Sequence, residues 1–282
     1  MSTQATAPTA ARHHATPPQI ETGGERTWIT RGANFVVAVS DVRAGTRLAR
    51  AEQADEYMVF LVDVGARFEA GAERLDARAE TLTIVPPGAS AITALGDGRI
   101  VRVFSGQATD LLERAGNASV YANGAPEVAP LVPWPAPPEG FRLRHYVLSE
   151  HTRPDTNMRI FRCTNLMLNV MTPRMVARDV HKLSPHSHAD FEQGSLAVRG
   201  DWVHHLRHPW TADLDDWKAD EHLEMGSPSL LVVPPKVIHT SRNTNDGGAW
   251  LVDIFAPPRL DFASKPGKVA NEAEYPLPGA AT

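Results

Sequence analysis

The sequence predicts an all-β protein with two barrels in one chain. Short apolar runs rich in β-branched residues alternate with turn residues, which is typical of β-barrels and sandwiches. A proline-rich stretch interrupts the chain near its middle, and the segments on its two sides resemble each other. A chain of 282 residues can supply the cores of two modest domains.

Eight runs carry the strand pattern. In order they are residues 35–39, 57–62, 82–85, 100–104, 158–162, 165–171, 196–198 and 250–255. Turn residues separate them, and only residues 108–115 read as a short helix.

The proline-rich stretch divides the chain. Residues 122–140 contain six prolines, which exclude a helix or a central strand and predict an extended linker. We therefore expect a first barrel over 26–121 and a second over 141–262. Residues 1–25 are rich in Ala, Thr and Pro and predict a disordered tail, and 263–282 predict an irregular tail.

Two histidine-bearing segments predict a metal site. His186 and His188 stand two residues apart, which on a strand places both side chains on one face. Glu192 keeps the same parity, and His239 follows a strand-like run about fifty residues later. Three imidazoles and one carboxylate suit one divalent transition metal such as Fe(II), Mn(II), Ni(II) or Zn(II).

These segments resemble the two motifs of the cupin superfamily. His186-x-His188-x3-Glu192 is similar to the first motif, and the run from Pro234 to Asn243 is similar to the second. Lys236 stands where the second motif usually has a turn glycine. The resemblance covers roughly residues 160–260. It implies double-stranded β-helix (jelly-roll) barrels and the ligands His186, His188, Glu192 and His239, but the superfamily is too diverse to imply one reaction.

The two halves read as degenerate copies. The run Leu82–Gly88 parallels 230–236, and aligning Glu56 with Glu192 places Arg50 and Glu52 opposite the first two histidines. Ala91 then falls opposite His239. Because the first half offers no imidazole at these positions, we expect a bicupin with one metal-binding barrel.

Other residues near the motifs are candidates for the pocket. His204 shares the parity of Glu192, and either Arg178 or Arg242 could bind a substrate carboxylate. Gln193 has the opposite parity and is expected to face outward or to pair elsewhere. The acidic segment 211–225 predicts a solvated loop, or else a lid or an oligomer contact over the barrel mouth.

Composition excludes some classes of binding partner. A net charge of −5 and a pI near 6.2 provide no basic surface for nucleic acid or anionic membranes, and no run approaches the roughly 20 apolar residues of a membrane span. The single cysteine, Cys163, fits a reducing cytoplasm. We expect a cytoplasmic homo-oligomer, a dimer, that acts on a small molecule.

The ligand set leaves three functions open. Three histidines and a glutamate leave two positions of an octahedral shell open for substrate, with or without O2. An Fe(II) dioxygenase is slightly favoured, because the ligand set is complete and the neighbouring strands are apolar. An isomerase or decarboxylase that uses Mn(II), Ni(II) or Zn(II) without O2 is the alternative. A bicupin that binds a small molecule without catalysis is the third.

Overall fold

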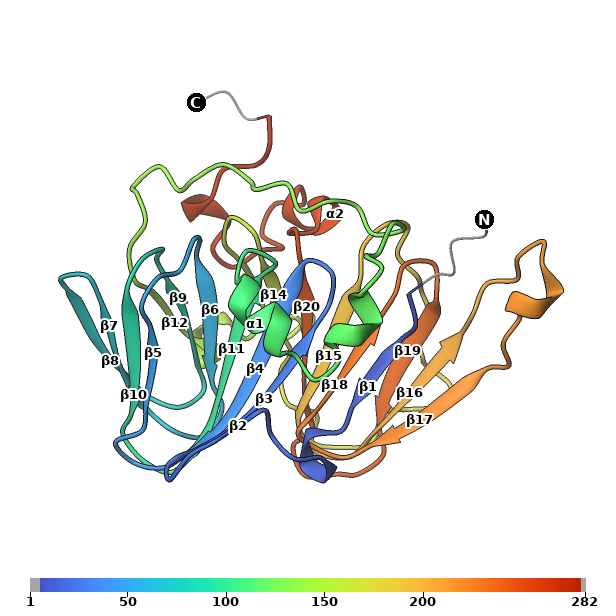
Figure 1. The fold of residues 1–282 in the computed structure, drawn as a ribbon, viewed down its shortest axis with the longest axis horizontal. Helices are drawn as coiled ribbons and strands as arrows, with labels where there is room; N and C mark the ends of the chain where they lie inside the picture. Colours follow the sequence, from blue (N-terminus) through green and yellow to red (C-terminus); the bar gives the residue numbers. More distant parts are fainter. Residues whose placement is uncertain (1–5, 280–282) are drawn as a thin grey trace.

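The computed structural model describes residues 6–279 and is almost entirely β-structure (Figure 1). The strands form two units, each with one large and one small antiparallel sheet. All eight predicted runs contain strand, and the predicted short helix is α1 (Thr109–Arg114). The all-β prediction is therefore confirmed.

The first unit contains a seven-stranded sheet in the order β12-β9-β6-β11-β4-β3-β2 and a four-stranded sheet in the order β5-β10-β7-β8. Its strands are β2 (Ile20–Glu21), β3 (Glu25–Arg31), β4 (Phe35–Val42), β5 (Arg47–Arg50), β6 (Tyr57–Leu61), β7 (Ala66–Ala70), β8 (Glu73–Ala77), β9 (Thr81–Val85), β10 (Ser90–Ala94), β11 (Gly98–Ser105) and β12 (Arg144–Val147).

The second unit contains a six-stranded sheet in the order β1-β18-β15-β20-β14-β13 and a three-stranded sheet in the order β17-β16-β19. Its strands are β1 (Thr9–Ala11), β13 (Ile160–Arg162), β14 (Met167–Val170), β15 (Gln193–Arg199), β16 (Trp202–Arg207), β17 (Glu221–Met225), β18 (Ser229–Val233), β19 (Ile238–Asn243) and β20 (Trp250–Phe255). The short helix α2 (Leu260–Ala263) follows β20.

Each unit receives one strand from the other half of the chain. β1, near the N-terminus, pairs with β18 in the second unit, and β12, just after the linker, pairs with β9 in the first. The prediction of a disordered tail over 1–25 is thus wrong for the described residues 6–25, whereas residues 1–5 lie outside them. Sequence composition missed this order because the three residues of β1 acquire their hydrogen bonds from a strand more than 200 positions away.

The two large sheets pack face to face. Met58 and Phe60 of β6 belong to the same buried cluster as Leu196 and Val198 of β15. The side chains that alternate with them point the other way, into their own barrels. Each of these central strands is therefore buried on both faces.

The interiors of the two barrels differ. A large apolar cluster that includes Tyr57, Phe68, Ile92 and Phe104 fills the first barrel. The clusters inside the second barrel are smaller and leave a cavity near its middle. Apolar side chains thus fill most of the interior of the first barrel, whereas the interior of the second borders a cavity.

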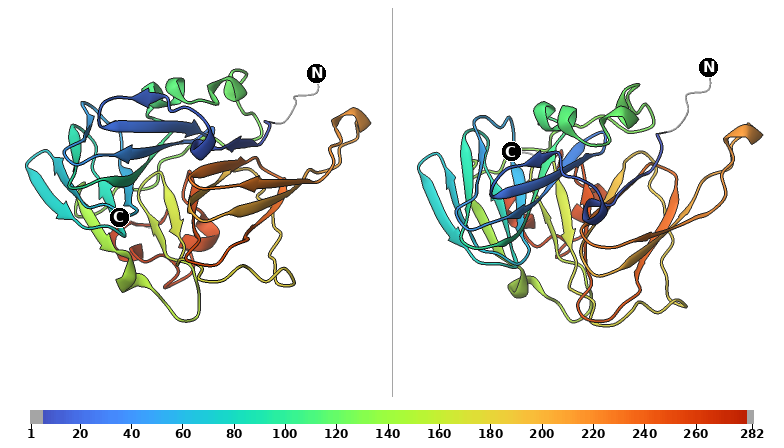
Figure 2. Two further views of the ribbon diagram at one scale, coloured as in Figure 1. Left: turned by 90° about the horizontal axis from the view of Figure 1, so that it is seen from below. Right: turned by 60° about the horizontal axis from the view of Figure 1, so that its bottom comes forward.

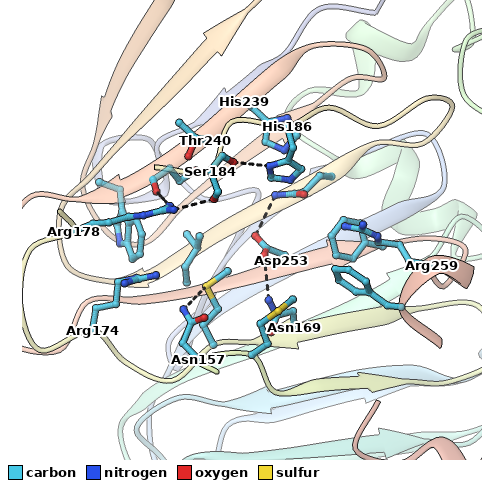
Figure 3. A pocket seen from close by; sticks show the side chains of 18 residues that line it. Asn157, Asn169, Arg174, Arg178, Ser184, His186, His239, Thr240, Asp253 and Arg259 are labelled. Carbon is cyan, nitrogen blue, oxygen red and sulfur yellow. Dashed lines mark hydrogen bonds between the residues drawn. The ribbon is translucent and has the colours of Figure 1, made fainter. Parts of the chain in front are cut away.

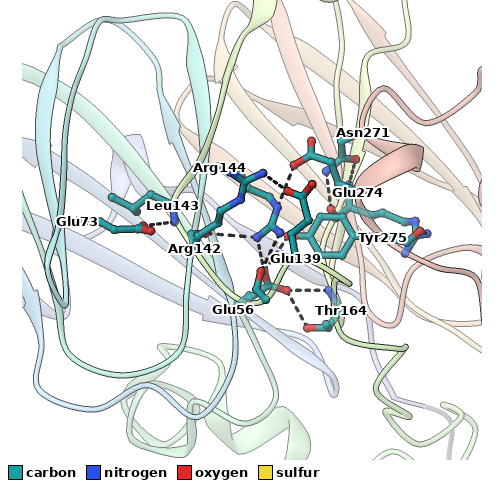
Figure 4. A network of polar contacts seen from close by, with 12 residues as sticks. Glu56, Glu73, Glu139, Arg142, Leu143, Arg144, Thr164, Asn271, Glu274 and Tyr275 are labelled. Carbon is teal, nitrogen blue, oxygen red and sulfur yellow. Dashed lines mark hydrogen bonds and ion pairs between the residues drawn. The ribbon is translucent and has the colours of Figure 1, made fainter. Parts of the chain in front are cut away.

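A repeated polar contact joins the barrels (Figure 4). Glu56, just before β6, accepts hydrogen bonds from the Tyr275 hydroxyl at 2.7 Å and from the Thr164 backbone N–H at 3.2 Å. Glu192, just before β15, accepts the equivalent bonds from the Tyr121 hydroxyl at 2.8 Å and from the Ala33 N–H at 2.6 Å.

Two asparagines make equivalent hydrogen bonds in the two halves. Asn117 bonds both backbone groups of Arg31, and Asn271 bonds both backbone groups of Arg162. Each asparagine stands four residues before the tyrosine that binds the buried glutamate. The shared pattern indicates that the halves are duplicated, as the parallel between 82–88 and 230–236 predicted.

The connection between β16 and β17 projects away from the second barrel (Figure 2). Trp210 and Trp217 stack in it with ring centroids 4.2 Å apart. No helix within residues 6–279 is long and apolar enough to cross a membrane.

Candidate metal centre

Three of the four predicted ligands converge. One nitrogen from each of His186, His188 and His239 lies within 4.8 Å of the others. The chain around His186 does not form the predicted strand: this residue makes an isolated bridge to His239, with backbone N–H···O bonds of 3.1 and 2.8 Å. That bridge and β19 bring the two motifs together.

Hydrogen bonds to the backbone orient two of the rings. Nδ1 of His186 lies 2.9 Å from the Ser184 carbonyl oxygen, and Nδ1 of His239 lies 3.0 Å from that of Val237. A carbonyl oxygen can only accept, so both Nδ1 atoms carry the proton and both Nε2 lone pairs are free. Nε2 of His239 is buried without a hydrogen-bond partner. A metal ion would satisfy that nitrogen.

Burial keeps two of the imidazoles neutral. It lowers the pKa of His188 to about 3 and that of His239 to about 4. A metal ligand must be deprotonated at the nitrogen that binds. These two rings are thus in the protonation state that binds metal at neutral pH.

Glu192, the predicted fourth ligand, lies elsewhere. Its carboxylate is in the contact between the barrels described above, where burial raises its pKa to about 7. The parity argument failed because the chain bends at Ala189 and Asp190, so alternation cannot be counted from His186. β15 begins only at Gln193.

Gln193 takes the expected place of Glu192, so the prediction that it faces outward is wrong. Its Oε1 lies 2.9 Å from Nε2 of His188. Its Nε2 donates to Ser195 Oγ at 2.9 Å and to Asp253 Oδ1 at 3.2 Å, which fixes the amide with its oxygen toward the histidines. Because an amide oxygen can only accept, Nε2 of His188 donates this hydrogen bond, and Gln193 orients the His188 ring within the cluster.

The turn before His239 departs from the usual glycine without losing its shape. Lys236 has a φ of +67°, the left-handed conformation that glycine adopts most easily. Its N–H donates to the His188 carbonyl oxygen at 2.6 Å. The strained turn thereby ties the two histidine segments together.

His186 and His239 border a cavity of about 280 Å³ (Figure 3). Its wall is apolar in part and also carries several polar and charged side chains. The residues with such groups are Asn157, Asn169, Arg174, Arg178, Ser184, Gln193, Thr240, Ser241, Asp253 and Arg259.

Asp253 is the carboxyl group of this cavity. It sits within the apolar run of β20, and burial raises its pKa to about 6. Asn169 donates to its Oδ2 at 3.3 Å. A charged residue inside an apolar strand is a signal that sequence analysis could have used, because such residues are rarely buried without a role.

The other predicted residues divide between cavity and surface. Arg178 lines the cavity, whereas the Arg242 guanidinium points to the outer face and donates to His205 at 3.3 Å. His204 is buried, and its Nδ1 lies 2.7 Å from the hydroxyl of Ser241, which lines the cavity. Sequence analysis missed Arg174 because no local pattern distinguishes it from a surface arginine.

The first barrel lacks the equivalent groups. Strand pairing matches Gln193 to Tyr57 and Asp253 to Arg102. It also places Ala49, rather than Arg50, opposite His186, because Ala49 pairs with Ala91 as His186 pairs with His239. Tyr57 bonds the Ser90 hydroxyl at 2.9 Å and packs in the apolar core.

Comparison with known proteins finds similarity to solved structures only. No family model matches the chain, and no curated protein matches it. Among solved structures, oxalate decarboxylase from Bacillus subtilis is 15% identical, with a TM-score of 0.59 over 94% of this chain and 83% of that one.

Two further structures are similar to the same degree. Oxalate decarboxylase from Lactobacillus farciminis, solved as a formate complex, is 16% identical with a TM-score of 0.59 over 94% of this chain and 92% of that one. Protein Ylba from E. coli is 11% identical with a TM-score of 0.59 over 90% and 92%. The chain therefore shares the fold of these solved structures, which agrees with the all-β barrels that the two motifs imply.

Proposed function

We propose that this protein is a metal-dependent cupin enzyme that performs Lewis-acid chemistry on a small oxygenated substrate, without consuming O2. The observation that carries the proposal is the histidine cluster, in which two rings present free Nε2 atoms because their Nδ1 atoms are held by backbone carbonyls. Its position at the wall of a cavity gives a small molecule access to a bound ion.

The ligand set supports the reaction class. Three neutral imidazoles and the Gln193 amide carry no negative charge, whereas the expected glutamate would carry one. Anionic ligands stabilise the higher oxidation states that oxygen activation requires, and a neutral set leaves the full divalent charge available to polarise a substrate oxygen. This favours isomerisation or decarboxylation with Mn(II), Ni(II) or Zn(II) over an Fe(II) dioxygenase.

A proton carrier lies beside this set. Asp253 lines the same cavity, and Gln193 and Asn169 fix its carboxyl group. An enolate formed from a substrate needs such a group to give or take a proton. The solved structures of similar fold include oxalate decarboxylases, which supports a carboxylic acid as the substrate.

The test separates metal binding from oxygen use. Protein purified without added metal is analysed for its elements, and turnover of small keto acids and dicarboxylates is compared in air and under argon with Mn(II), Zn(II) or Fe(II). We expect one ion per chain and equal turnover in both atmospheres. The variant His186→Ala should take up no stoichiometric metal while its circular dichroism is unchanged.

Two results would contradict the proposal. Turnover that requires both Fe(II) and O2 would replace it with the dioxygenase. Tight binding of a small ligand without turnover of any substrate would replace it with a binding protein.

A further inference from the structure

The charges around the cavity are not balanced. Arg259 forms an ion pair with Asp261 at 2.7 Å. Arg174 and Arg178 lie together on the other side (Figure 3), and among residues 6–279 neither has an ion-pair partner. Two half-buried cations thus face the same cavity, and no carboxylate of the described residues lies at ion-pair distance from either.

The two guanidinium groups are held differently. Arg178 donates to the Ser241 carbonyl oxygen at 2.7 Å and to Ser184 Oγ at 2.9 Å, so its position is fixed by neutral acceptors. The Arg174 guanidinium has no hydrogen-bond partner in the described chain, and only its backbone is tied, to Ala249. Its five N–H donors are available to a ligand.

Both guanidinium groups are partly removed from water, and no nearby negative charge compensates for the lost hydration. Burial lowers the pKa of Arg174, and burial together with the charge of Arg174 lowers the pKa of Arg178. Cations that are partly desolvated are usually paired. An anionic ligand would supply the missing charge, and a planar carboxylate matches the fork of a guanidinium.

We propose that Arg174, supported by Arg178, binds a carboxylate of the substrate, so that a small dicarboxylate or keto acid spans the cavity between this pair and the histidine cluster. The proposal rests on the proposed function for the role of the histidines. The arginine pair itself needs no metal. A ligand of this size is consistent with a cavity of about 280 Å³.

Binding is measured by calorimetry with malonate, succinate, propionate and inorganic phosphate, on metal-free and on Mn(II)-loaded protein. Arg174→Gln removes the charge and should weaken dicarboxylate binding at least about tenfold, whereas Arg174→Lys should weaken it less. Arg67→Gln is the matched control, because it removes one charge from an exposed ion pair with Asp76 on the first barrel. It should leave binding unchanged.

The binding measurements can contradict the inference or change the kind of anion that it names. Equal affinity of Arg174→Gln and wild type, or no carboxylate binding by either form of the wild type, would overturn the inference. Tighter binding of inorganic phosphate than of any carboxylate, lost in Arg174→Gln, would replace carboxylate with phosphate. Absorption of Co(II)-loaded Arg174→Gln should match wild type, which shows that the histidine cluster is intact.

The inference and the proposed function can fail separately. Protein that binds carboxylates through Arg174 but takes up no metal would contradict the proposed function alone. Protein that takes up metal but binds carboxylates equally with and without Arg174 would contradict the inference alone.

Discussion

Two neighbouring residues, Glu192 and Gln193, have opposite roles because they point to opposite sides of one strand. Glu192 faces the other barrel and is 2% exposed. Gln193 faces the cavity and is 5% exposed. A single residue of error in strand parity therefore exchanges a residue of the cavity for an interface contact.

We expect Gln193→Ala and Glu192→Gln to separate these roles. Gln193→Ala should weaken Co(II) binding by about tenfold or more, the lower end of effects seen when groups that support a metal site are removed. Glu192→Gln should keep the metal affinity but lower the free energy of unfolding by about 1–3 kcal/mol, because its amide cannot accept both existing hydrogen bonds. Equal loss of metal affinity in both variants would restore Glu192 as the ligand.

His13 gives the protein a source of acid sensitivity away from the metal centre. It is 3% exposed, its Nε2 lies 2.9 Å from the Thr30 hydroxyl, and burial lowers its pKa to about 3. The unfolded chain binds a proton near pH 6.5 but the native state does not, so native stability falls as the pH drops from 6.5 toward 3.

His13→Gln should reduce this pH dependence, because glutamine can keep the hydrogen bond and does not titrate. Between pH 6.5 and 5 the wild type should lose about 1–2 kcal/mol more stability than the variant. Urea unfolding at several pH values measures the free energy of unfolding of both proteins and so this difference. Parallel stability curves for the two proteins would show that His13 is not the cause.

At the scale of elements, the turn at Lys236 controls how the two histidine segments meet. A left-handed conformation costs a residue with a side chain about 1–2 kcal/mol. Lys236→Gly should relieve this strain, and Lys236→Ala should keep it. We therefore expect the glycine variant to unfold at a higher urea concentration than the alanine variant, by about 1 kcal/mol, with metal binding unchanged in both.

The strands of the fold were predictable where apolar residues are continuous. β6 is buried on both faces and reads as an unbroken apolar run, and β9, β11 and β20 are largely apolar and largely buried. β8 and β17 were missed, because they carry mostly polar side chains and their strand structure depends on pairing with neighbours.

The candidate site was predictable to the extent that local motifs define it. The spacing of His186, His188 and His239 was sufficient to predict that these residues lie close together. Gln193 and Asp253 were not found, because their positions depend on where β15 begins and on its register with β20. Register is a property of the folded sheets and leaves little trace in one sequence.

At the scale of the whole molecule, the barrels form one unit through their shared core and the two glutamate–tyrosine contacts. We expect a single unfolding transition in urea, with coincident curves from circular dichroism and tryptophan fluorescence. Tyr275→Phe and Tyr121→Phe should each lower the free energy of unfolding by about 1–3 kcal/mol, because each leaves a buried carboxylate with one hydrogen bond fewer. Two separate transitions would show that the barrels fold independently.

The exchanged strands β1 and β12 also protect the protein from its own copies. Without β1, the N–H and C=O groups along the apolar stretch Leu230, Leu231 and Val232 of β18 would lie open at the edge of a sheet. Open edges of this kind recruit strands from other chains and start aggregation. β12 closes β9 of the first sheet in the same manner. Each half of the chain thus covers an open sheet edge in the other half's barrel.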